Sequence, residues 1–271
     1  MNANELKRMT ATFGNTAATP LLFLGHGNPM NAIMDNEFSR GWRTVGESLA
    51  RPRAVLCVSA HWETSGTYVT AMEKPQTIHD FGGFPSQLYD VQYPAPGNPA
   101  LARETKRTVS KTTVELDHQW GLDHGCWSVI KHLFPEADVP VVQMSLDYTK
   151  RARWHYELAR ELAPLRKKGV LIVGSGNVVH NLRMADWDEK GGFDWALEAN
   201  ERIKKFVSTN DHQPLIDYRS QGRELELAVP TPEHYFPLLY VLALKEEKES
   251  VSFFNDKAEW GSISMTSLKI E

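Results

Sequence analysis

Four short apolar runs constrain the fold of this chain most, because each of them ends abruptly in a polar turn. They are residues 20–24, 54–58, 139–144 and 170–173. An apolar run of this length that does not alternate with polar residues is typical of a strand buried on both faces, as in a parallel sheet. The sequence therefore predicts a mostly parallel central sheet with both faces covered.

Helical segments lie between and after these runs. The predicted helices cover residues 98–111, 150–168 and 193–207, and a fourth begins at residue 231. Asn98 supplies an N-cap before Pro99, and Gly169 supplies a C-terminal stop. The alternation of strands and helices predicts an α/β fold in which helices flank the sheet.

The remaining segments complete the predicted organisation. Residues 251–254 and 262–267 look like added strands near an edge of the sheet. Residues 64–96 are irregular, rich in glycine and proline, and too long for an ordinary connection, which favours a functional loop. We expect residues 1–18 to be a disordered lead-in and residues 19–271 to form one domain, because 271 residues suffice for one large core but not for two.

Composition narrows the class of protein. Thirty Lys and Arg residues stand against 34 Asp and Glu residues, and no basic tract suggests a nucleic-acid partner. No apolar stretch approaches the roughly 20 residues that cross a bilayer, and the first residues lack the apolar segment of a secretory signal. Cys57 and Cys126 lie in apolar surroundings and cannot form a disulfide framework. We expect a soluble cytoplasmic protein without a membrane partner; the sequence leaves the oligomeric state open.

Several histidines lie at the predicted strand ends, where an α/β fold usually holds its functional residues. Of the ten in the chain, His26, His61 and His180 each follow a predicted strand. Open α/β sheets bind ligands at the carboxyl ends of their strands, and neutral imidazole is a ligand for Zn, Fe, Ni and Cu. His234 is expected in the first turn of a helix. A single histidine after a strand is more often structural, but three on one predicted rim indicate a shared metal or catalytic centre.

The other histidines are weaker candidates. His124 is either a helix-start residue or a site residue, and His79 lies in the long loop. Four more histidines lie in polar or helical settings and are expected to be surface or packing residues: His118, His132, His155 and His212.

Several motif-based alternatives fail. The segment that begins at Gly174 lacks the third glycine of a dinucleotide-binding turn and is not a nucleophile elbow. Residues 80–82 read Asp-Phe-Gly and match the kinase magnesium motif by chance, since no other kinase motif is present. The apolar neighbours of Cys126 favour an inert core thiol over a nucleophile.

Six motifs occur in a fixed order along the chain. They are Leu24-Gly-His-Gly-Asn-Pro-Met30, Ser59-Ala-His-Trp-Glu63, His79-Asp-Phe-Gly-Gly-Phe-Pro85, Leu122-Asp-His-Gly-Cys-Trp127, Gly174-Ser-Gly-Asn-Val-Val-His-Asn181 and Thr231-Pro-Glu-His234. In this order they resemble the class III extradiol ring-cleavage dioxygenases, in the branch called 4,5-DOPA extradiol dioxygenases. The resemblance covers about residues 20–268 and makes residues 19–271 the catalytic domain.

The resemblance implies a non-haem metal held at the strand ends. It implies His26, His61 and His234 as metal ligands and His180 as the catalytic histidine, and it leaves open whether His180 also contacts the metal. His124 matches a second histidine close to the substrate. Better-known extradiol enzymes use two histidines and one carboxylate, so a third histidine is a departure. Fe(II) is expected for catalysis, and an all-nitrogen site also suits bound Zn(II).

The expected reaction is the opening of a catechol ring by O2 to give a muconate semialdehyde, with DOPA the favoured substrate and His180 the general base. Candidate walls for the flat ring are Phe81, Phe84, Trp127 and Tyr235. Arg183 is a weak candidate for binding a substrate carboxylate. One alternative is a zinc-dependent hydrolase in which His180 or Glu63 activates water. Another is a binding protein without turnover.

Overall fold

The computed structural model describes residues 16–271, so most of the predicted lead-in, residues 1–15, lies outside the described residues. At the start of the described part, the Thr16 amide donates a hydrogen bond to the Lys167 carbonyl at 2.6 Å. The Thr19 hydroxyl donates to the Val170 carbonyl, also at 2.6 Å. Backbone and side-chain contacts therefore join this segment to the start of a central strand.

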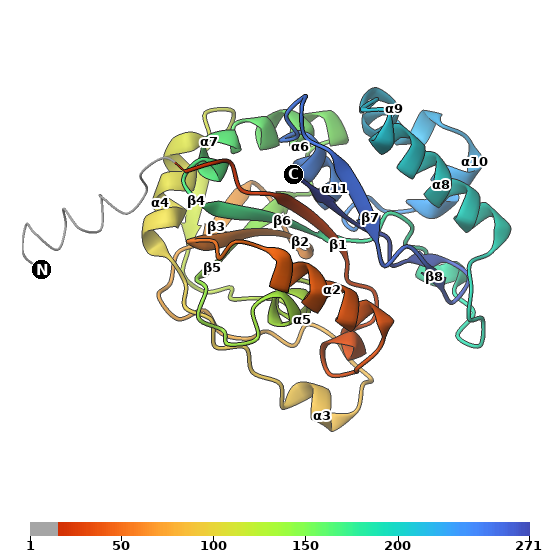
Figure 1. Cartoon of the computed structure of the whole chain (residues 1–271), viewed down its shortest axis with the longest axis horizontal. Coiled ribbons are helices and arrows are strands. Elements are labelled where there is room, and N and C mark those ends of the chain that lie inside the picture. Colours follow the sequence, from red (N-terminus) through yellow and green to blue (C-terminus); the bar gives the residue numbers. More distant parts are fainter. Residues whose placement is uncertain (1–15) are drawn as a thin grey trace, which may run out of the picture.

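Four parallel strands form the middle of an eight-stranded sheet with the order β4-β3-β5-β2-β6-β1-β10-β7 (Figure 1). The four are β1 Leu21–Gly25, β2 Ala54–Thr64, β5 Val141–Asp147 and β6 Val170–Gly176. β6 pairs in parallel with both β1 and β2, and β2 pairs in parallel with β5. The parallel central sheet predicted from the apolar runs is confirmed.

The edges of the sheet differ in part from the prediction. On one side β3, Thr67–Thr70, pairs antiparallel with β5 and parallel with β4, Val114–Asp117. The prediction of one irregular loop over residues 64–96 was therefore wrong for residues 67–70, where β-branched and aromatic side chains favour a strand. The glycines and prolines that suggested irregularity cluster later, from residue 82 onward.

On the other side β10, Ser267–Ile270, pairs antiparallel with β1 and with β7, Val251–Phe254. The predicted strand over residues 251–254 is confirmed. The one over residues 262–267 is divided, because β9, Ile263–Ser264, instead pairs with β8, Ala258–Glu259, in a separate two-stranded sheet.

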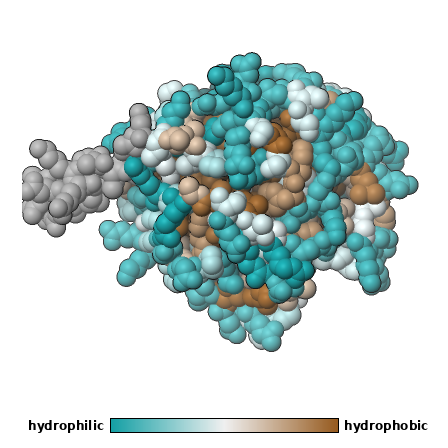
Figure 2. All heavy atoms as spheres, viewed as in Figure 1, coloured by the Kyte–Doolittle hydropathy of each residue, from teal (hydrophilic) through white to brown (hydrophobic). Residues whose placement is uncertain are grey.

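Helices cover both faces of the sheet, and each face has its own apolar core. Alternate residues of a strand point to opposite faces. In β1, Leu21 and Phe23 join the core beneath α4, α6, α8 and α11, whereas Leu22 and Leu24 join the core beneath α2 and α5. These helices span Glu37–Ser48 (α2), Pro99–Thr108 (α4), His124–Leu133 (α5), Ala152–Arg160 (α6), Asp194–Ser208 (α8) and Phe236–Leu242 (α11). Figure 2 shows that one outer face is mostly hydrophilic, with apolar side chains in small patches.

Two predicted helices keep their place and two are changed by proline. Asn98 caps α4 by accepting from the Leu101 amide at 2.9 Å, as predicted, and α8 matches residues 193–207. The predicted helix over residues 150–168 breaks into α6 and α7, Ala163–Arg166, because Pro164 lacks an amide N–H and fits only the first turn.

For the same reason α11 begins at Phe236 rather than at residue 231, since Pro237 must lie in its first turn. His234 is therefore in the turn that precedes the helix, not in the helix as predicted. Shorter helices are η2 Pro29–Ala32, α3 Ser86–Tyr89, η3 Leu182–Met184, α9 Gln213–Ile216, η4 Tyr218–Ser220 and α10 Arg223–Ala228. Within residues 16–271, no helix is long and apolar enough to cross a bilayer. The cytoplasmic location stays a prediction.

Buried histidines outside the strand-end cluster give the fold a dependence on pH. His155 is fully buried, with Nδ1 3.0 Å from the Tyr240 hydroxyl and Nε2 3.2 Å from the Asp147 carbonyl oxygen. Burial lowers the pKa of His155 from 6.5 to about 4. The unfolded chain thus binds this proton at a higher pH than the folded chain, so acidification favours unfolding.

We expect the free energy of unfolding to fall as the pH drops from 6.5 to about 4, with His155 contributing on the order of 1.4 kcal/mol per pH unit. In His155→Gln this part of the slope should disappear, as measured by urea unfolding of metal-free protein across that range. The exposed His118, changed to Gln, is the control that should keep the wild-type slope. Equal slopes in wild type and His155→Gln would contradict this account.

Candidate metal centre

Five histidines from separate segments meet at the carboxyl ends of the central strands. His26 directly follows β1, His61 lies in β2, and His124 is the first residue of α5. His180 follows β6, and His234 precedes α11. The ring centroids of His26 and His61 lie 5.0 Å apart, and His234 lies 5.2 Å from His26 and 5.0 Å from His61. Because β2, β6 and β1 are neighbours in the sheet, their ends bring these rings to one place.

Glycines allow these segments to approach closely. A Cβ at Gly176 would lie 2.1 Å from the His234 carbonyl oxygen, so a side chain there would displace the turn that carries His234. A Cβ at Gly125 would lie 2.6 Å from the Ser59 hydroxyl oxygen and 2.7 Å from the His61 ring. The glycines in these two motifs are thus required by the packing around the histidines.

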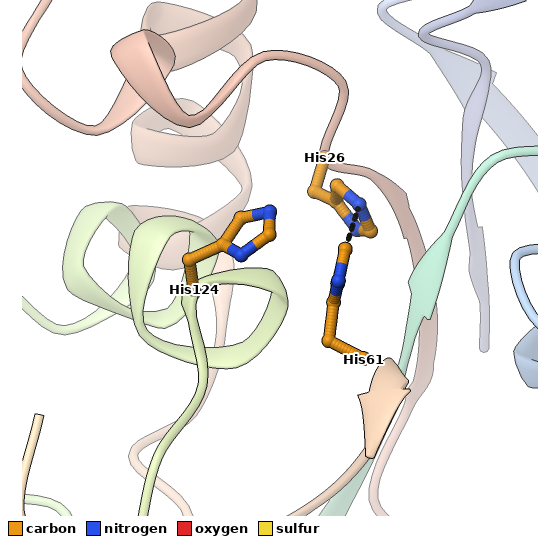
Figure 3. A group of neighbouring side chains, drawn as sticks. All are labelled: His26, His61 and His124. Atoms are coloured by element: carbon orange, nitrogen blue, oxygen red, sulfur yellow. Dashed lines mark hydrogen bonds between the residues drawn. The ribbon is translucent and has the colours of Figure 1, made fainter. Parts of the chain in front are cut away.

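His26 and His61 face each other through their Nε2 atoms at 3.1 Å (Figure 3). The Ser175 hydroxyl donates to the Gly125 carbonyl at 2.5 Å, so it accepts a hydrogen bond from His26 Nδ1, 3.0 Å away. His26 therefore carries its proton on Nδ1 and presents a lone pair at Nε2.

The spacing of these two nitrogens fits a metal ion. Nitrogen ligands bind such an ion at about 2.0–2.1 Å, so two ligands that subtend an angle between about 90° and the tetrahedral angle at the metal lie roughly 2.8–3.4 Å apart. The 3.1 Å separation falls in that range. His26, His61 and His124 form one group of ligand atoms within 4.8 Å of one another, and His180, Glu233 and His234 form a second. The structure thus places all four predicted metal ligands in the cluster, and adds His124 beside His26 and His61.

Burial keeps the rings of His26, His61, His180 and His234 neutral. Burial lowers the pKa of His61 to about 3 and that of His180 to about 4, with nearby His124 the next cause in both. The pKa values of His26 and His234 are also held well below 6.5 by burial and then by neighbouring histidines. Since only neutral imidazole coordinates a metal, these rings are ready to bind one at pH 7.

Asp80 is the site residue that the sequence analysis missed. Its Oδ1 accepts from the His124 amide at 2.8 Å, and its Oδ2 lies 2.9 Å from His124 Nδ1 and 3.5 Å from His61 Nδ1. Burial raises the pKa of Asp80, but its hydrogen bonds with His124 and its electrostatic interactions with the His124 and His61 rings lower the pKa more, so the carboxylate is ionised. Asp80 belongs to the motif that starts at His79, but that motif assigns no role to its carboxylate.

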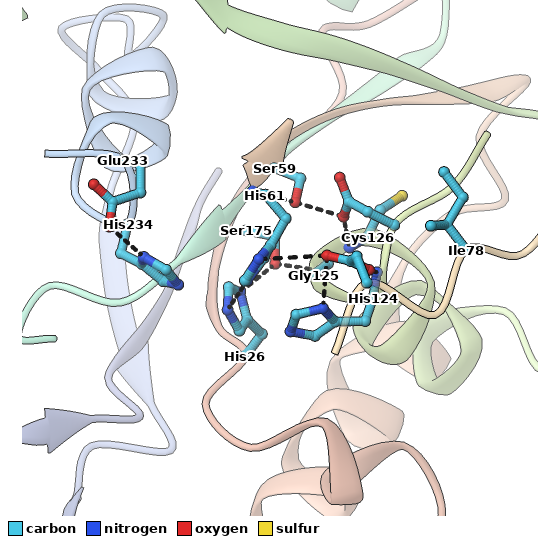
Figure 4. Close-up of polar contacts among 12 residues, drawn as sticks. His26, Ser59, His61, Ile78, His124, Gly125, Cys126, Ser175, Glu233 and His234 are labelled. Atoms are coloured by element: carbon cyan, nitrogen blue, oxygen red, sulfur yellow. Dashed lines mark hydrogen bonds and ion pairs between the residues drawn. The ribbon is translucent and has the colours of Figure 1, made fainter. Parts of the chain in front are cut away.

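His124 is both a helix-start residue and a site residue. The N-cap of α5 is the fully buried Asp123, which accepts from the Cys126 amide at 3.0 Å and from the Ser59 hydroxyl at 2.7 Å. These bonds fix the first turn of α5 against β2, and they hold His124 beside the rings of His26 and His61 (Figure 4).

His180 and His234 form a stacked pair on the other side of the cluster. Their ring centroids lie 3.5 Å apart with 8° between the ring planes. His234 Nδ1 lies 3.2 Å from Glu233 Oε1, so the carboxylate holds one ring nitrogen and leaves Nε2 for the site. Glu233 thus supports His234 from its far side, the usual place of a carboxylate beside a metal-binding histidine.

Other candidates lie farther from the cluster. Of the predicted aromatic walls, Phe81 lies 5.5 Å from His124 by ring centroids, and Phe84 packs on Phe81. Trp127 and Tyr235 are core residues, with their polar atoms bonded to the carbonyls of Ile78 and Leu215.

Three polar candidates are not among the clustered histidines. His79 bonds the Val91 carbonyl oxygen at 3.0 Å. Arg183 is exposed. Glu63 is also an exposed residue, but burial of its carboxyl group and then the charge of Glu233 raise its pKa, so it lies close to the turn that carries His234.

Comparisons with known proteins show the family to which the chain belongs. Residues 18–259 match the family model described as the catalytic LigB subunit of aromatic ring-opening dioxygenase. The chain is 48% identical to the 4,5-DOPA dioxygenase extradiol of Escherichia coli K12 over 93% of this chain and 94% of that protein. It is 34% identical to the protein of the same name from Beta vulgaris, over 91% and 94%. The crystal structure of an uncharacterized Escherichia coli K12 protein superposes with a TM-score of 0.82 and 44% identity, covering 93% of this chain and all of that one.

Removing either facing imidazole should abolish metal binding. We expect His26→Ala and His61→Ala to retain less than about a tenth of the wild-type metal content by plasma mass spectrometry, because each loses one of the two facing Nε2 ligands. His79→Ala is the matched control, since this loop histidine bonds a backbone carbonyl instead. Normal metal content in both cluster variants would place the ion elsewhere.

Proposed function

Because the chain belongs to the family of aromatic ring-opening dioxygenases, we propose that it opens a catechol ring by extradiol cleavage with O2. The observation that supports this most is the pair of facing Nε2 atoms of His26 and His61 at the carboxyl ends of the central strands. Two relatives that this chain matches over almost their whole length are named 4,5-DOPA dioxygenase extradiol. DOPA is therefore the first substrate to test. The product would be a muconate semialdehyde.

The proposed resident metal is non-haem Fe(II), held by His26, His61 and His234, with His180 close enough to join them. When bound, this metal supplies the electron-transfer chemistry that O2 needs in order to react with a catechol. The same nitrogen donors also suit Zn(II), which is redox-inert. Zinc in purified protein would therefore be compatible with the site but would not support ring opening.

His180 is the proposed acid-base residue. Its ring is neutral at pH 7, so it can accept a proton from a catechol hydroxyl. Burial lowers its pKa in the free protein, and a negatively charged catecholate next to it would favour the protonated ring. Stacking on His234 fixes the plane of the His180 ring, which limits the directions in which it can take up and return that proton.

His124 and Phe81 are proposed to orient the substrate. The Nδ1 of His124 is occupied by Asp80, so its Nε2 can accept a hydrogen bond from a substrate hydroxyl. Phe81 packs edge-to-face against the His124 ring and offers an apolar surface to a flat aromatic ring. The zinc hydrolase alternative loses support from family membership.

Oxygen consumption tests the reaction class. We expect protein reconstituted anaerobically with Fe(II) to consume one O2 per DOPA and to form a yellow ring-opened product, followed by ultraviolet-visible spectroscopy. Zinc-loaded protein is the control and should consume none. If fully iron-loaded protein consumed no O2 with DOPA or with simple catechols, the dioxygenase proposal would fail.

The role of His180 is tested separately from metal binding. We expect His180→Ala to lower kcat by about 10²–10⁴-fold while retaining most of its iron, because the proton acceptor is lost and three other histidines remain. Iron content and O2 uptake are measured on the same samples. Unchanged turnover at full iron loading would exclude His180 as the acid-base group.

A further inference from the structure

We propose that Asp80 is a positioning residue that sets the tautomer of His124, so that this ring keeps an unprotonated Nε2 for the centre of the cluster, and that its charge helps His61 to move its proton to Nδ1 when a cation binds. The proposal rests on the position of one carboxylate beside two imidazole rings that come from different elements. His61 comes from β2 and His124 from the start of α5, whereas Asp80 comes from the connection between β3 and α3. Its role goes beyond the proposed function by assigning a residue that contacts no substrate.

The contacts define which nitrogen carries the proton. An ionised carboxylate only accepts hydrogen bonds, so a ring nitrogen beside it must carry hydrogen. Oδ2 of Asp80 lies 2.9 Å from Nδ1 of His124, within hydrogen-bond distance, and 3.5 Å from Nδ1 of His61, as an electrostatic neighbour. A neutral imidazole has one N–H, so a proton on Nδ1 leaves a lone pair on Nε2.

The Nε2 of His61 has a second partner that competes with Asp80 for the position of the proton. It lies 3.1 Å from Nε2 of His26, which is itself unprotonated because Ser175 occupies Nδ1. Without a cation, this contact is a hydrogen bond in which Nε2–H of His61 donates to His26. A cation between the two nitrogens requires lone pairs on both, so the proton of His61 must then move to Nδ1, where Asp80 stabilises it.

A purely structural role for Asp80 is the competing explanation. Its Oδ1 accepts from the His124 amide at 2.8 Å, which satisfies one of the free N–H groups at the start of α5. Asp80→Asn separates the two roles, because the amide oxygen can keep this bond while the NH2 group now faces Nδ1 of His124. That NH2 can only donate, so it favours the opposite tautomer, with hydrogen on Nε2.

The direct test is histidine side-chain ¹⁵N NMR on the whole, chelator-treated chain at pH 7.5. In the wild-type protein we expect an Nδ1–H signature for His124, and His61 should change to Nδ1–H when Zn(II) is added. In Asp80→Asn we expect His124 to change to Nε2–H and the affinity for Zn(II), measured by chelator competition, to fall by about 10–100-fold. An Nε2–H signature for His124 in the wild type would overturn the proposal without any variant.

Asp123→Asn is the matched control. This buried carboxylate also lies at the start of α5, but it accepts from the Ser59 hydroxyl and the Cys126 amide rather than from a histidine ring. It should leave both tautomers unchanged. If both variants changed the tautomers equally, Asp80 would have only a structural role as a cap of α5. The same would follow if Asp80→Asn lost thermal stability but kept the native tautomers.

The inference rests on the proposed metal centre, but the two can fail separately. Tautomers are read in metal-free protein without any turnover. Native tautomers in Asp80→Asn together with active enzyme would overturn the role of Asp80 alone. Asp80-dependent tautomers in a protein that consumes no O2 with any catechol would support the role of Asp80 and overturn the dioxygenase function.

Discussion

The approach of two imidazole nitrogens, His26 Nε2 and His61 Nε2 at 3.1 Å, is the contact on which the rest of the structure depends. Because His26 carries its proton on Nδ1, the contact is a hydrogen bond while His61 carries a proton on Nε2, and a metal ion that bound both nitrogens would replace that proton. The packing around the two rings holds them together. Ser175 fixes one ring, glycines let the neighbouring segments close in, and the rigid parallel sheet sets the spacing of the strand ends.

Much of this could be read from the sequence because the relevant signals are local. Unbroken apolar runs predicted the four central strands. The histidines that follow such runs predicted which edge of the sheet holds the candidate site. Pro164 and Pro237 were equally local signals, and the predictions failed there because helical spacing was followed past a residue without an amide N–H.

The remainder depends on contacts between distant segments. Nothing near Asp80 in the sequence indicates that its carboxylate meets a ring 44 residues later. The second core, the short strand β3 and the stacking of His180 on His234 likewise arise only when the sheet is assembled. The predicted ligand set of His26, His61, His180 and His234 is compatible with the geometry and stays a prediction, as does the choice between iron and zinc.

The five histidines come from five segments that span residues 26 to 234, so the complete cluster exists only in the folded chain. An ion held there binds the native state in preference to the unfolded one, and thermodynamic linkage then adds RT ln(1 + [ion]/Kd) to stability. At a free ion concentration 100 times Kd this amounts to about 2.7 kcal/mol, a sizeable fraction of the stability of an ordinary domain. Metal supply in the cell would thus govern how much folded protein persists, as well as how much of it is active.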